Sequence, residues 1–149
     1  MKIEKFPLKA RAKCAYCDST VYGYVQYVDE LVEGYVWFKT LEGALVMVKE
    51  DTVCAFTGAE DDLGVDVYEG DVIQIEGAID NEPFTENFLI AFIQQQGAFC
   101  AFDEKGRADE VGLYNFFYNK DFFVTVVGNI YDTPEIIKGW KKPSEESLC

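Results

Sequence analysis

FTGAEDDLGVDVYEGDVIQIEG, residues 56–77, is the stretch on which the predicted fold depends. It contains a polar tip that closes near Gly64 and a short apolar segment, Val65–Tyr68, that returns from it. Glu69-Gly70-Asp71 predicts a tight turn, because Gly adopts backbone angles that are costly for other residues and Asp bonds nearby backbone N–H groups. The alternation in Val72–Glu76 is typical of a strand. We therefore predict a hairpin, a tight turn and a further strand.

Short apolar segments alternate with turn residues on both sides of this stretch, and Thr133 as N-cap with Pro134 after it is typical of a helix start. Turn signals recur about every 8–12 residues, which favours an antiparallel sandwich or barrel. We predict a mainly β fold of short antiparallel strands in a barrel-like or sandwich arrangement with a short C-terminal helix. The other predicted strands are Thr20–Asp29, Tyr35–Thr40, Ala44–Lys49, Val53–Thr57, Asn87–Ile93, Gly97–Asp103 and Phe122–Gly128.

Local composition adds finer predictions. Gly23, inside an aromatic and β-branched strand, predicts a bulge or the close approach of another backbone. Residues 77–86 contain Pro83 and are interpreted as a loop. The unbroken apolar run Phe122–Gly128 predicts a strand that is buried on both faces. Ala108–Tyr118 leaves two alternatives open, a helical turn or an irregular aromatic strand.

Length and charge bound the class of protein. The chain has 149 residues, which fits a single domain, predicted over residues 1–140 with a polar tail over residues 141–149. No apolar run approaches the roughly 20 residues of a membrane span, and the N-terminal segment lacks the apolar core of a signal peptide. We therefore expect a cytoplasmic protein of a bacterial host cell. The formal net charge of −14 repels phosphate groups and disfavours nucleic acid as a partner.

The sequence contains no His, which removes the commonest general base, imidazole metal ligands and His-activated nucleophiles. We therefore expect no enzymatic activity and no cofactor. Cys14 and Cys17 form a Cys-x-x-Cys pair, which is compatible with half of a zinc site or with a redox pair. A zinc site needs a second pair, whereas Cys54 and Cys100 stand singly. The favoured interpretation is two unrelated thiols at a turn.

Three blocks of the sequence carry a family resemblance. They are Arg11-Ala12-Lys13 with Val21-Tyr22-Gly23-Tyr24; Thr52–Gly58 with Gly64 and Val67–Val72; and Val126–Ile137. In this order and spacing, over most of the chain, they resemble the YopX family of phage and prophage proteins. The resemblance implies a mostly β fold and a small cytoplasmic protein carried by a phage or mobile element. It implies no established enzymatic activity and no cofactor.

Twelve residues in these blocks form the family motif. Turn geometry accounts for their residue types, and we interpret them as structural. They are Tyr22, Gly23, Tyr24, Thr57, Gly58, Tyr68, Glu69, Gly70, Asp71, Gly128, Asn129 and Pro134. Members of the family usually carry lysines in the hairpin tip between the Thr-Gly pair and the Tyr-Glu-Gly-Asp turn. Here the tip is acidic, so this chain lacks any phosphate contact that a basic tip would make.

The acidic tip contains Glu60, Asp61, Asp62 and Asp66. One interpretation is a divalent-cation site, or a surface that attracts a basic host or phage protein. The other is a solvated tip that keeps a strand edge from pairing with other chains. The acids lack the Asp-x-Asp-x-Asp-Gly spacing of a Ca²⁺ loop, which favours the second interpretation.

Three function classes follow from these observations. The leading hypothesis is an accessory protein that acts by protein–protein contact as a homo-oligomer, because the aromatic residues from Tyr114 to Phe123 favour a core or subunit interface. The alternative is a nucleic-acid-binding small β-barrel protein that uses the basic residues of segment 2–13, with those aromatic side chains as a base-stacking platform. A metal-dependent hydrolase that uses the carboxylates is the third.

Overall fold

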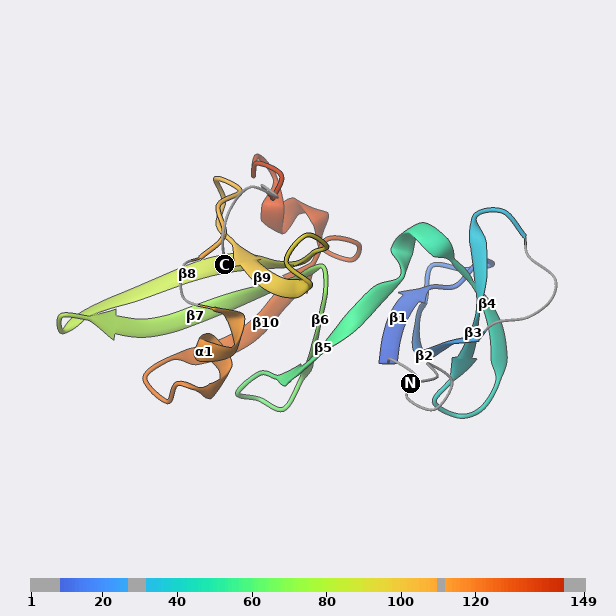
Figure 1. The fold of residues 1–149 in the computed structure, drawn as a ribbon, viewed down its shortest axis with the longest axis horizontal. Helices are drawn as coiled ribbons and strands as arrows, with labels where there is room; N and C mark the ends of the chain where they lie inside the picture. Colours follow the sequence, from blue (N-terminus) through green and yellow to red (C-terminus); the bar gives the residue numbers. More distant parts are fainter. Residues whose placement is uncertain (1–8, 27–31, 110–111, 144–149) are drawn as a thin grey trace. The chain divides into compact units, whose positions relative to one another are not determined.

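The computed structural model of the chain describes residues 9–26, 32–109 and 112–143 (Figure 1). The chain forms two compact units, Met1–Phe56 and Thr57–Cys149. Each unit has its own hydrophobic cluster. The single domain predicted over residues 1–140 stays a prediction beside this division into compact units. Of the polar tail predicted over residues 141–149, residues 144–149 lie outside the described residues.

The predicted mainly β fold of short antiparallel strands is confirmed, and residues 113–118 take the helical alternative. Within the described part of the chain, no helix is long and apolar enough to cross a membrane. The elements are β1 (Lys9–Lys13), β2 (Thr20–Gln26), β3 (Tyr35–Thr40), β4 (Leu45–Lys49), the 3-10 helix η2 (Glu50–Thr52), β5 (Cys54–Glu60), β6 (Asp66–Tyr68), β7 (Asp71–Ile79), β8 (Glu82–Ile93), β9 (Ala98–Phe102), α1 (Leu113–Tyr118), β10 (Phe123–Asn129) and the 3-10 helix η3 (Pro134–Ile137).

The first unit is a curled antiparallel sheet in the strand order β4-β3-β2-β1-β5. Cys14, directly after β1, makes an isolated antiparallel bridge to Val48 of β4, so the sheet bends back toward its own edge. The N–H of Ala15 adds a hydrogen bond to the carbonyl of Met47 at 3.0 Å. The buried residues inside this curl are Ala10, Ala12, Phe38 and Val48, with partly buried valines from β2, β3 and β4 and from the residue before β5.

Gly23 of β2 lies where the backbone of β3 comes closest. It pairs with Thr40, and a Cβ atom built on it would collide with the backbone of Lys39 and Thr40. The predicted close approach is therefore confirmed, and its physical reason is the tight curl of the sheet. The flanking side chains of Tyr22 and Tyr24 lie on the opposite face, where Tyr22 is exposed and Tyr24 is half-buried.

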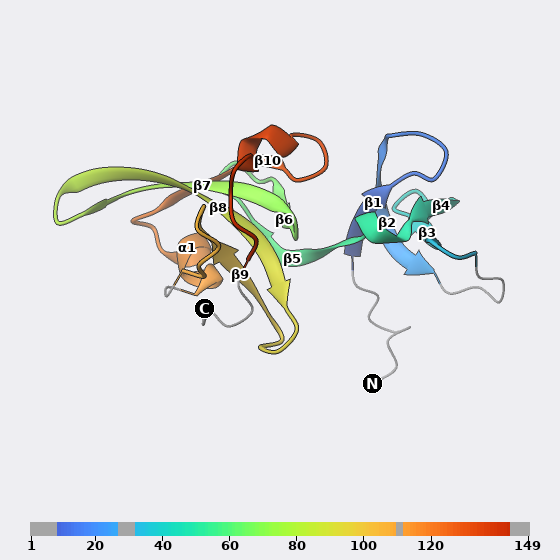
Figure 2. The same cartoon turned by 90° about the horizontal axis from the view of Figure 1, so that it is seen from above.

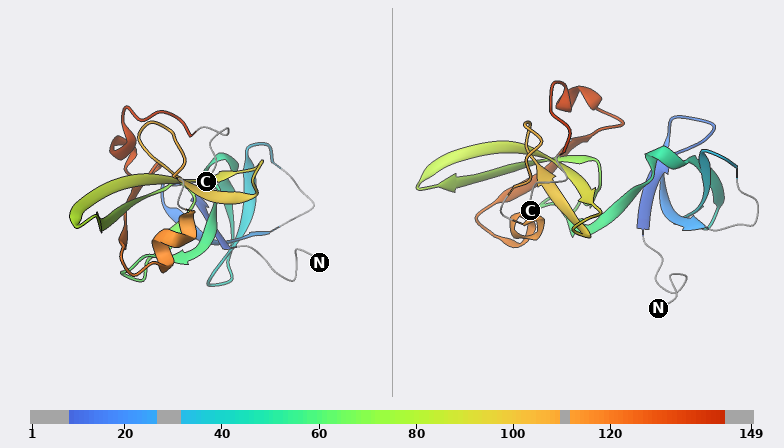
Figure 3. Two further views of the ribbon diagram at one scale, coloured as in Figure 1. Left: turned by 60° about the vertical axis from the view of Figure 1, so that its left-hand side comes forward. Right: turned by 45° about the horizontal axis from the view of Figure 1, so that its top comes forward.

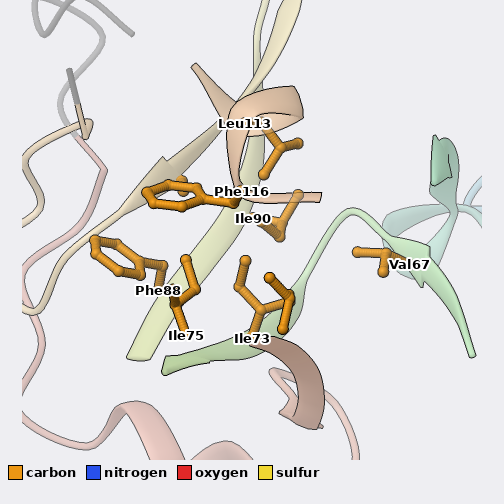
Figure 4. Packing of buried hydrophobic residues seen from close by; sticks show 9 residues of the cluster. Val67, Ile73, Ile75, Phe88, Ile90, Leu113 and Phe116 are labelled. Carbon is orange, nitrogen blue, oxygen red and sulfur yellow. The ribbon is translucent and has the colours of Figure 1, made fainter. Parts of the chain in front are cut away.

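The second unit is built on an antiparallel sheet in the strand order β10-β7-β8-β9. The buried side chains on one face of β7 and β8 are Ile73, Ile75, Phe88 and Ile90. The helix α1 covers this face (Figure 3). Its residues Leu113 and Phe116 are three positions apart and so point to the same side of the helix. Figure 4 shows both side chains over the isoleucines, with Phe116 stacked on Phe88 at a centroid distance of 5.5 Å.

β7 and β8 form a long hairpin, and Figure 2 shows its end reaching beyond the rest of the sheet. The strands stay paired to the last possible position, Ile79 opposite Glu82. Asp80 and Asn81 form the two-residue turn with positive φ angles of 51° and 68°. This turn geometry matches the twist of a two-stranded hairpin, and Asn and Asp tolerate it better than most residues.

The prediction of a loop over residues 77–86 is therefore wrong. Pro83 lies inside β8 opposite Ala78, and β9 pairs with β8 only from Leu89 onward. The outer edge of β8 at Pro83 is thus free of a neighbouring strand, and the missing N–H of proline breaks no ladder hydrogen bond there. Pro83 thus occupies a position where β8 is an edge strand, and β8 continues through Pro83.

β10 is an edge strand, which corrects the prediction that the run Phe122–Gly128 is buried on both faces. Val124 is fully buried, whereas Phe123 and Val127 are 45% and 38% exposed. A register shift beside Val127 leaves this residue without an opposite partner on β7. The continuous apolar run thus combines one buried face with a bulge, and a bulge interrupts the alternation from which burial was inferred.

We expect Gly23→Ala to lower the free energy of unfolding of the first unit by about 1–3 kcal/mol, because the added methyl group overpacks the contact with Lys39 and Thr40. Chemical denaturation followed by circular dichroism measures this change. The matched control is Gly112→Ala, since Gly112 has φ −54° and open space around its Cα. Equal effects of the two substitutions would contradict the close-approach explanation.

Candidate functional site

The acidic tip closes onto the protein through Asp61, which is only 6% exposed. Its Oδ1 atom accepts hydrogen bonds from the N–H groups of Leu63 and Val65 at 2.9 and 2.8 Å. Its Oδ2 atom accepts a hydrogen bond from the N–H of Val126 in β10 at 2.9 Å. The two oxygens of this carboxylate therefore hold the tip in its turn and join the tip to β10.

Asp62 makes a second connection to β10. Its Oδ2 atom accepts from the N–H of Val124 at 2.6 Å, and its own N–H donates to the Val124 carbonyl at 2.9 Å. Together, Asp61 and Asp62 occupy the backbone N–H groups on the side of β10 that faces away from β7. An open strand edge is a template for pairing with another chain, and these carboxylates cover it.

The structure thus supports the edge-protecting interpretation of the tip. Glu60 is exposed and Asp66 is half-buried, while the two aspartates between them bond the backbone. Among residues 9–26, 32–109 and 112–143, no group of three or more Cys, Asp or Glu side chains is placed to hold a metal ion. The cation-site interpretation therefore has no ligand set in that part of the chain.

The Tyr68-to-Asp71 turn is held from inside by a side chain. Asp71 is 1% exposed, and its Oδ2 atom accepts from the N–H of Tyr68 at 2.8 Å. Gly70 has φ +86°, in the left-handed region that glycine adopts without the cost of a Cβ clash. The side-chain bond and the glycine conformation together produce the predicted tight turn.

The same turn joins three strands of the second unit. The N–H of Gly70 donates to the Ile90 carbonyl at 2.8 Å, and its carbonyl accepts from the N–H of Ile130 at 3.0 Å. The Oε2 atom of Glu69 accepts from the N–H of Phe92 at 3.2 Å. These backbone partners belong to β8 and to the segment after β10, so the turn is a junction rather than a free loop.

Gly128 and Asn129 form a second junction at the end of β10. The Oδ1 atom of Asn129 accepts from the N–H groups of Tyr131 and Asp132 at 2.9 and 2.8 Å. The Oγ1 atom of Thr133 accepts from the N–H of Asn129 at 2.9 Å. A Cβ atom at Gly128 would collide with that hydroxyl, so glycine is required by the closeness of the turn.

The predicted short C-terminal helix is present as η3, a single 3-10 turn that begins at Pro134. The sequence predicted Thr133 as its N-cap. Thr133 does precede the turn, but its hydroxyl bonds Asn129 and makes no cap hydrogen bond to η3. The predicted position of Thr133 before the helix was correct. The predicted capping hydrogen bond was wrong, because the turn at Asn129 uses the hydroxyl of Thr133.

Thr57 and Gly58 close the β5–β6 hairpin. The hydroxyl of Thr57 donates to the carbonyl of Val67 at 2.7 Å and accepts from the N–H of Ala59 at 3.2 Å. Gly58 has φ +86°, another left-handed position. The second sequence block thus forms the hairpin whose tip covers the edge of β10.

Several motif positions, from Thr57 to Asn129, make hydrogen bonds within the fold. The model of the family described as YopX protein matches residues 11–138. The chain belongs to the YopX family. This confirms the resemblance that the three sequence blocks indicated. No curated protein matches the chain in a sequence comparison.

A solved structure supports the fold independently. The crystal structure of protein EF1440 from Enterococcus faecalis is similar to this YopX-family chain, with a TM-score of 0.54 and 20% sequence identity. The match covers 87% of this chain and 96% of that chain. At this identity the likeness concerns the fold alone.

The second unit carries large exposed apolar side chains at the hairpin tip and on α1. Together we call them the tyrosine surface, and they are Leu63, Val65, Tyr114 and Tyr118. The rings of Tyr114 and Tyr118 stack with centroids 6.1 Å apart. The hydroxyl of Tyr114 donates to the carbonyl of Thr57 at 3.3 Å, which connects the helix to the base of the hairpin. Several large apolar side chains are therefore held in solvent on one unit.

The aromatic residues from Tyr114 to Phe123, which were expected to form one group, are divided in the structure. Phe116 is buried in the core with Phe117 and Phe122 packed against it, while Tyr114 and Tyr118 are 52% and 73% exposed. Helical spacing was the signal that could have separated them, because residues four apart share one face. The spacing separates them only if the segment is helical, and the sequence left helix and strand as alternatives here.

Cys14 and Cys17 lie on the turn after β1, and both are free thiols. Cys17 is exposed, and its Sγ atom lies 2.8 Å from the Oγ atom of Ser19. Hydrogen bonds from the side chain and backbone of Ser19, and from the thiol of Cys14, lower the pKa of Cys17 below its ordinary value. Cys17 is thus a thiol with enhanced thiolate character at an accessible turn.

The basic segment of residues 2–13 is described only from Lys9 onward. The Nζ atom of Lys9 lies 5.0 Å from the ring centroid of Phe56, and Arg11 is 8% exposed. Lys13 donates from Nζ to the hydroxyl of Thr20 at 2.9 Å. The described bases of this segment are engaged within the first unit.

We expect Asp61→Asn to lower the free energy of unfolding by about 1–3 kcal/mol, since one of three backbone N–H donors would then face an amide N–H. Denaturant unfolding measures the loss. The control is Glu60→Gln at the neighbouring exposed position, which should stay within about 0.5 kcal/mol of the parent chain. A tip that unfolds with equal ease in both variants would refute the edge-covering role.

We expect Cys17 to react with iodoacetamide at a lower pH than an ordinary thiol, whose pKa is about 8.5, because a lowered pKa keeps the thiolate at lower pH. Alkylation rates at each pH, resolved by peptide mass spectrometry, give the midpoint. Ser19→Ala should raise that midpoint. A midpoint at or above the ordinary value in the parent chain would disprove the effect of Ser19.

Proposed function

We propose that this YopX-family protein acts by binding protein rather than by catalysis, and that the tyrosine surface is its contact surface. The observation that carries the proposal is the exposure of large apolar side chains, 73% for Tyr118 and 70% for Leu63. Tyr is enriched at interfaces relative to the rest of a protein surface, and the stacked pair Tyr114 and Tyr118 presents such side chains to solvent. The absence of His from the sequence supports a non-catalytic role.

The tyrosine surface is suited to binding because its parts are already held in place. Tyr114 is restrained by its bond to Thr57 and by its stacking on Tyr118. Leu63 and Val65 lie on a tip whose backbone is bonded by Asp61. Side chains that are ordered before association lose less conformational entropy when a partner binds.

The partner that we propose first is a second copy of this chain. Two copies carry a net charge of −14 each and repel one another, so the apolar contact must overcome that repulsion. Salt screens repulsion between surface charges. Self-association through the tyrosine surface should therefore strengthen as the salt concentration rises.

Sedimentation velocity over a range of protein concentrations, at about 0.05 M and about 0.5 M salt, tests this proposal. We expect a dimer that is more populated at high salt. Tyr118→Ser should weaken the association about tenfold, the effect expected at a moderate interface hot spot. The matched control is Tyr16→Ser, since Tyr16 is 82% exposed but belongs to the first unit. A monomer at every concentration and salt level rules out self-association.

A basic host or phage protein is a second candidate partner, favoured by the net charge of −14 and by the exposed acid Glu60 beside the tyrosine surface. The salt dependence separates the two candidates, because attraction between opposite charges weakens as salt rises. A partner captured from host lysate at low salt, and lost both at high salt and with Tyr118→Ser, would identify this case.

The biological setting that we propose is that of a phage or prophage accessory protein in the bacterial cytoplasm, as the YopX resemblance implies. The nucleic-acid alternative has less support, because Lys9, Arg11 and Lys13 are engaged within the first unit. A gel shift at low salt that disappears as salt rises would restore that alternative.

A further inference from the structure

The turn between β1 and β2 carries two thiols on a well-bonded backbone. The N–H of Cys14 donates to the carbonyl of Ser19 at 3.0 Å, and Lys13 pairs with Thr20 at the end of the two strands. The Nζ atom of Lys13 also donates to the hydroxyl of Thr20 at 2.9 Å. These bonds close the base of the turn, so Cys14 and Cys17 are held on one short connection.

Cys14 is the shielded member of this pair. It is 9% exposed, and its backbone bridges to Val48 of β4. The N–H of the next residue, Ala15, donates to the carbonyl of Met47 at 3.0 Å. The backbone at Cys14 is therefore fixed against β4, and its side chain has little access to solvent.

Cys17 is the accessible member of the pair. It is exposed, and its Sγ atom lies 2.8 Å from the Oγ atom of Ser19. The thiol of Cys14 makes a further hydrogen bond to the same sulfur atom. A hydrogen bond between thiols brings their sulfur atoms close together, and a disulfide needs a further approach to about 2.05 Å. The turn thus places a shielded thiol next to an accessible one.

The surroundings of Cys17 favour its thiolate form. Hydrogen bonds from the side chain and the backbone of Ser19, and then from the thiol of Cys14, lower the pKa of Cys17 and outweigh the opposing charge of Asp18. The thiolate is the form that attacks a disulfide. Redox-sensitive cysteines combine such a lowered pKa with access to solvent and an adjacent second thiol, and Cys17 has all three properties.

We propose that Cys14 and Cys17 form a dithiol site that is modified reversibly by the disulfides of low-molecular-weight thiols. The Cys17 thiolate attacks one sulfur of the disulfide R–S–S–R, forms the mixed disulfide Cys17–S–S–R and releases R–S⁻. The Cys14 thiol then loses its proton and attacks the Sγ atom of Cys17, which closes the Cys14–Cys17 disulfide and releases the second R–S⁻. The protein thiols lose two electrons, the reagent disulfide gains them, and the two protons end on the two released thiols.

The dithiol site goes beyond the proposed protein-binding function. Its residues belong to the first unit, whereas the tyrosine surface belongs to the second. The reaction modifies each chain once, so it requires no catalytic turnover and agrees with a non-enzymatic protein. In a reducing compartment such as the bacterial cytoplasm, disulfides are usually transient, and a disulfide of this kind would report the redox state of the cell.

Peptide mass spectrometry of the full chain tests the proposal, since the tryptic peptide of residues 14–39 contains both cysteines and no other. The reduced protein is incubated with oxidised glutathione, and the remaining thiols are alkylated. We expect this peptide to become lighter by two hydrogen atoms and to resist alkylation until dithiothreitol restores both thiols. Cys54, a buried thiol of β5, is the internal control and should react at least about tenfold more slowly than Cys17.

Two variants separate the roles of the thiols. Cys14→Ser removes the resolving thiol, so the glutathione adduct should accumulate on Cys17. Cys17→Ser removes the attacking thiol, so the reaction of Cys14 should slow about tenfold or more. If either variant fails to fold, the unaltered chain alone still decides whether the Cys14–Cys17 disulfide forms.

Four results would overturn the proposal. The first is no reaction of the unaltered chain with oxidised glutathione. The second is a stable glutathione adduct on Cys17 of the unaltered chain, which rules out resolution by Cys14. The third is Cys54 reacting as fast as Cys17, and the fourth is Cys14 reacting at an unchanged rate in Cys17→Ser. None of these results bears on the tyrosine surface, because the two sites share no residue.

Discussion

The second unit depends on carboxylates that take the place of a neighbouring strand along β10. Asp61 and Asp62 accept from the N–H groups of Val126 and Val124, which would otherwise form an open edge. Hydrogen bonds to a charged acceptor contribute about 1.5–3 kcal/mol each, more than neutral ones. The same bonds hold the β5–β6 hairpin beside the start of β10, next to α1. The position of the tyrosine surface follows from this connection, since two of its side chains lie on the hairpin and two on the helix.

The family motif builds the junctions around this edge. Gly70 bonds β8 and the segment after β10, while Asn129 turns the chain toward η3. The polar side-chain atoms of these turns accept hydrogen bonds from backbone N–H groups. The turns therefore matter for function by setting the path of the chain around the second sheet. The junction at Gly128-Asn129 directs the chain to η3, which lies on the side of the sheet opposite α1 (Figure 3).

Several features could be predicted from sequence because they arise from neighbouring residues. The turn at Gly70-Asp71, the short strands and the closeness at Gly23 follow from local backbone rules. Two predictions failed where a distant partner decides. Pro83 was taken as a loop residue. It lies in β8 at a position that β9 does not reach, because β9 pairs with β8 only from Leu89 onward. The run Phe122–Gly128 was taken as fully buried, although a bulge at Val127 and an edge position expose part of it.

The sequence by itself determined that this is a mainly β, strongly acidic member of the YopX family with structural turns at its motif positions. Those properties reside in composition, alternation and short-range backbone preference. Only the tertiary structure decided what the acidic tip does, which aromatic residues face solvent, and that Cys14 is buried beside β4 while Cys17 is exposed. Each of these depends on residues far apart in the chain, and the pairing of strands brings them together.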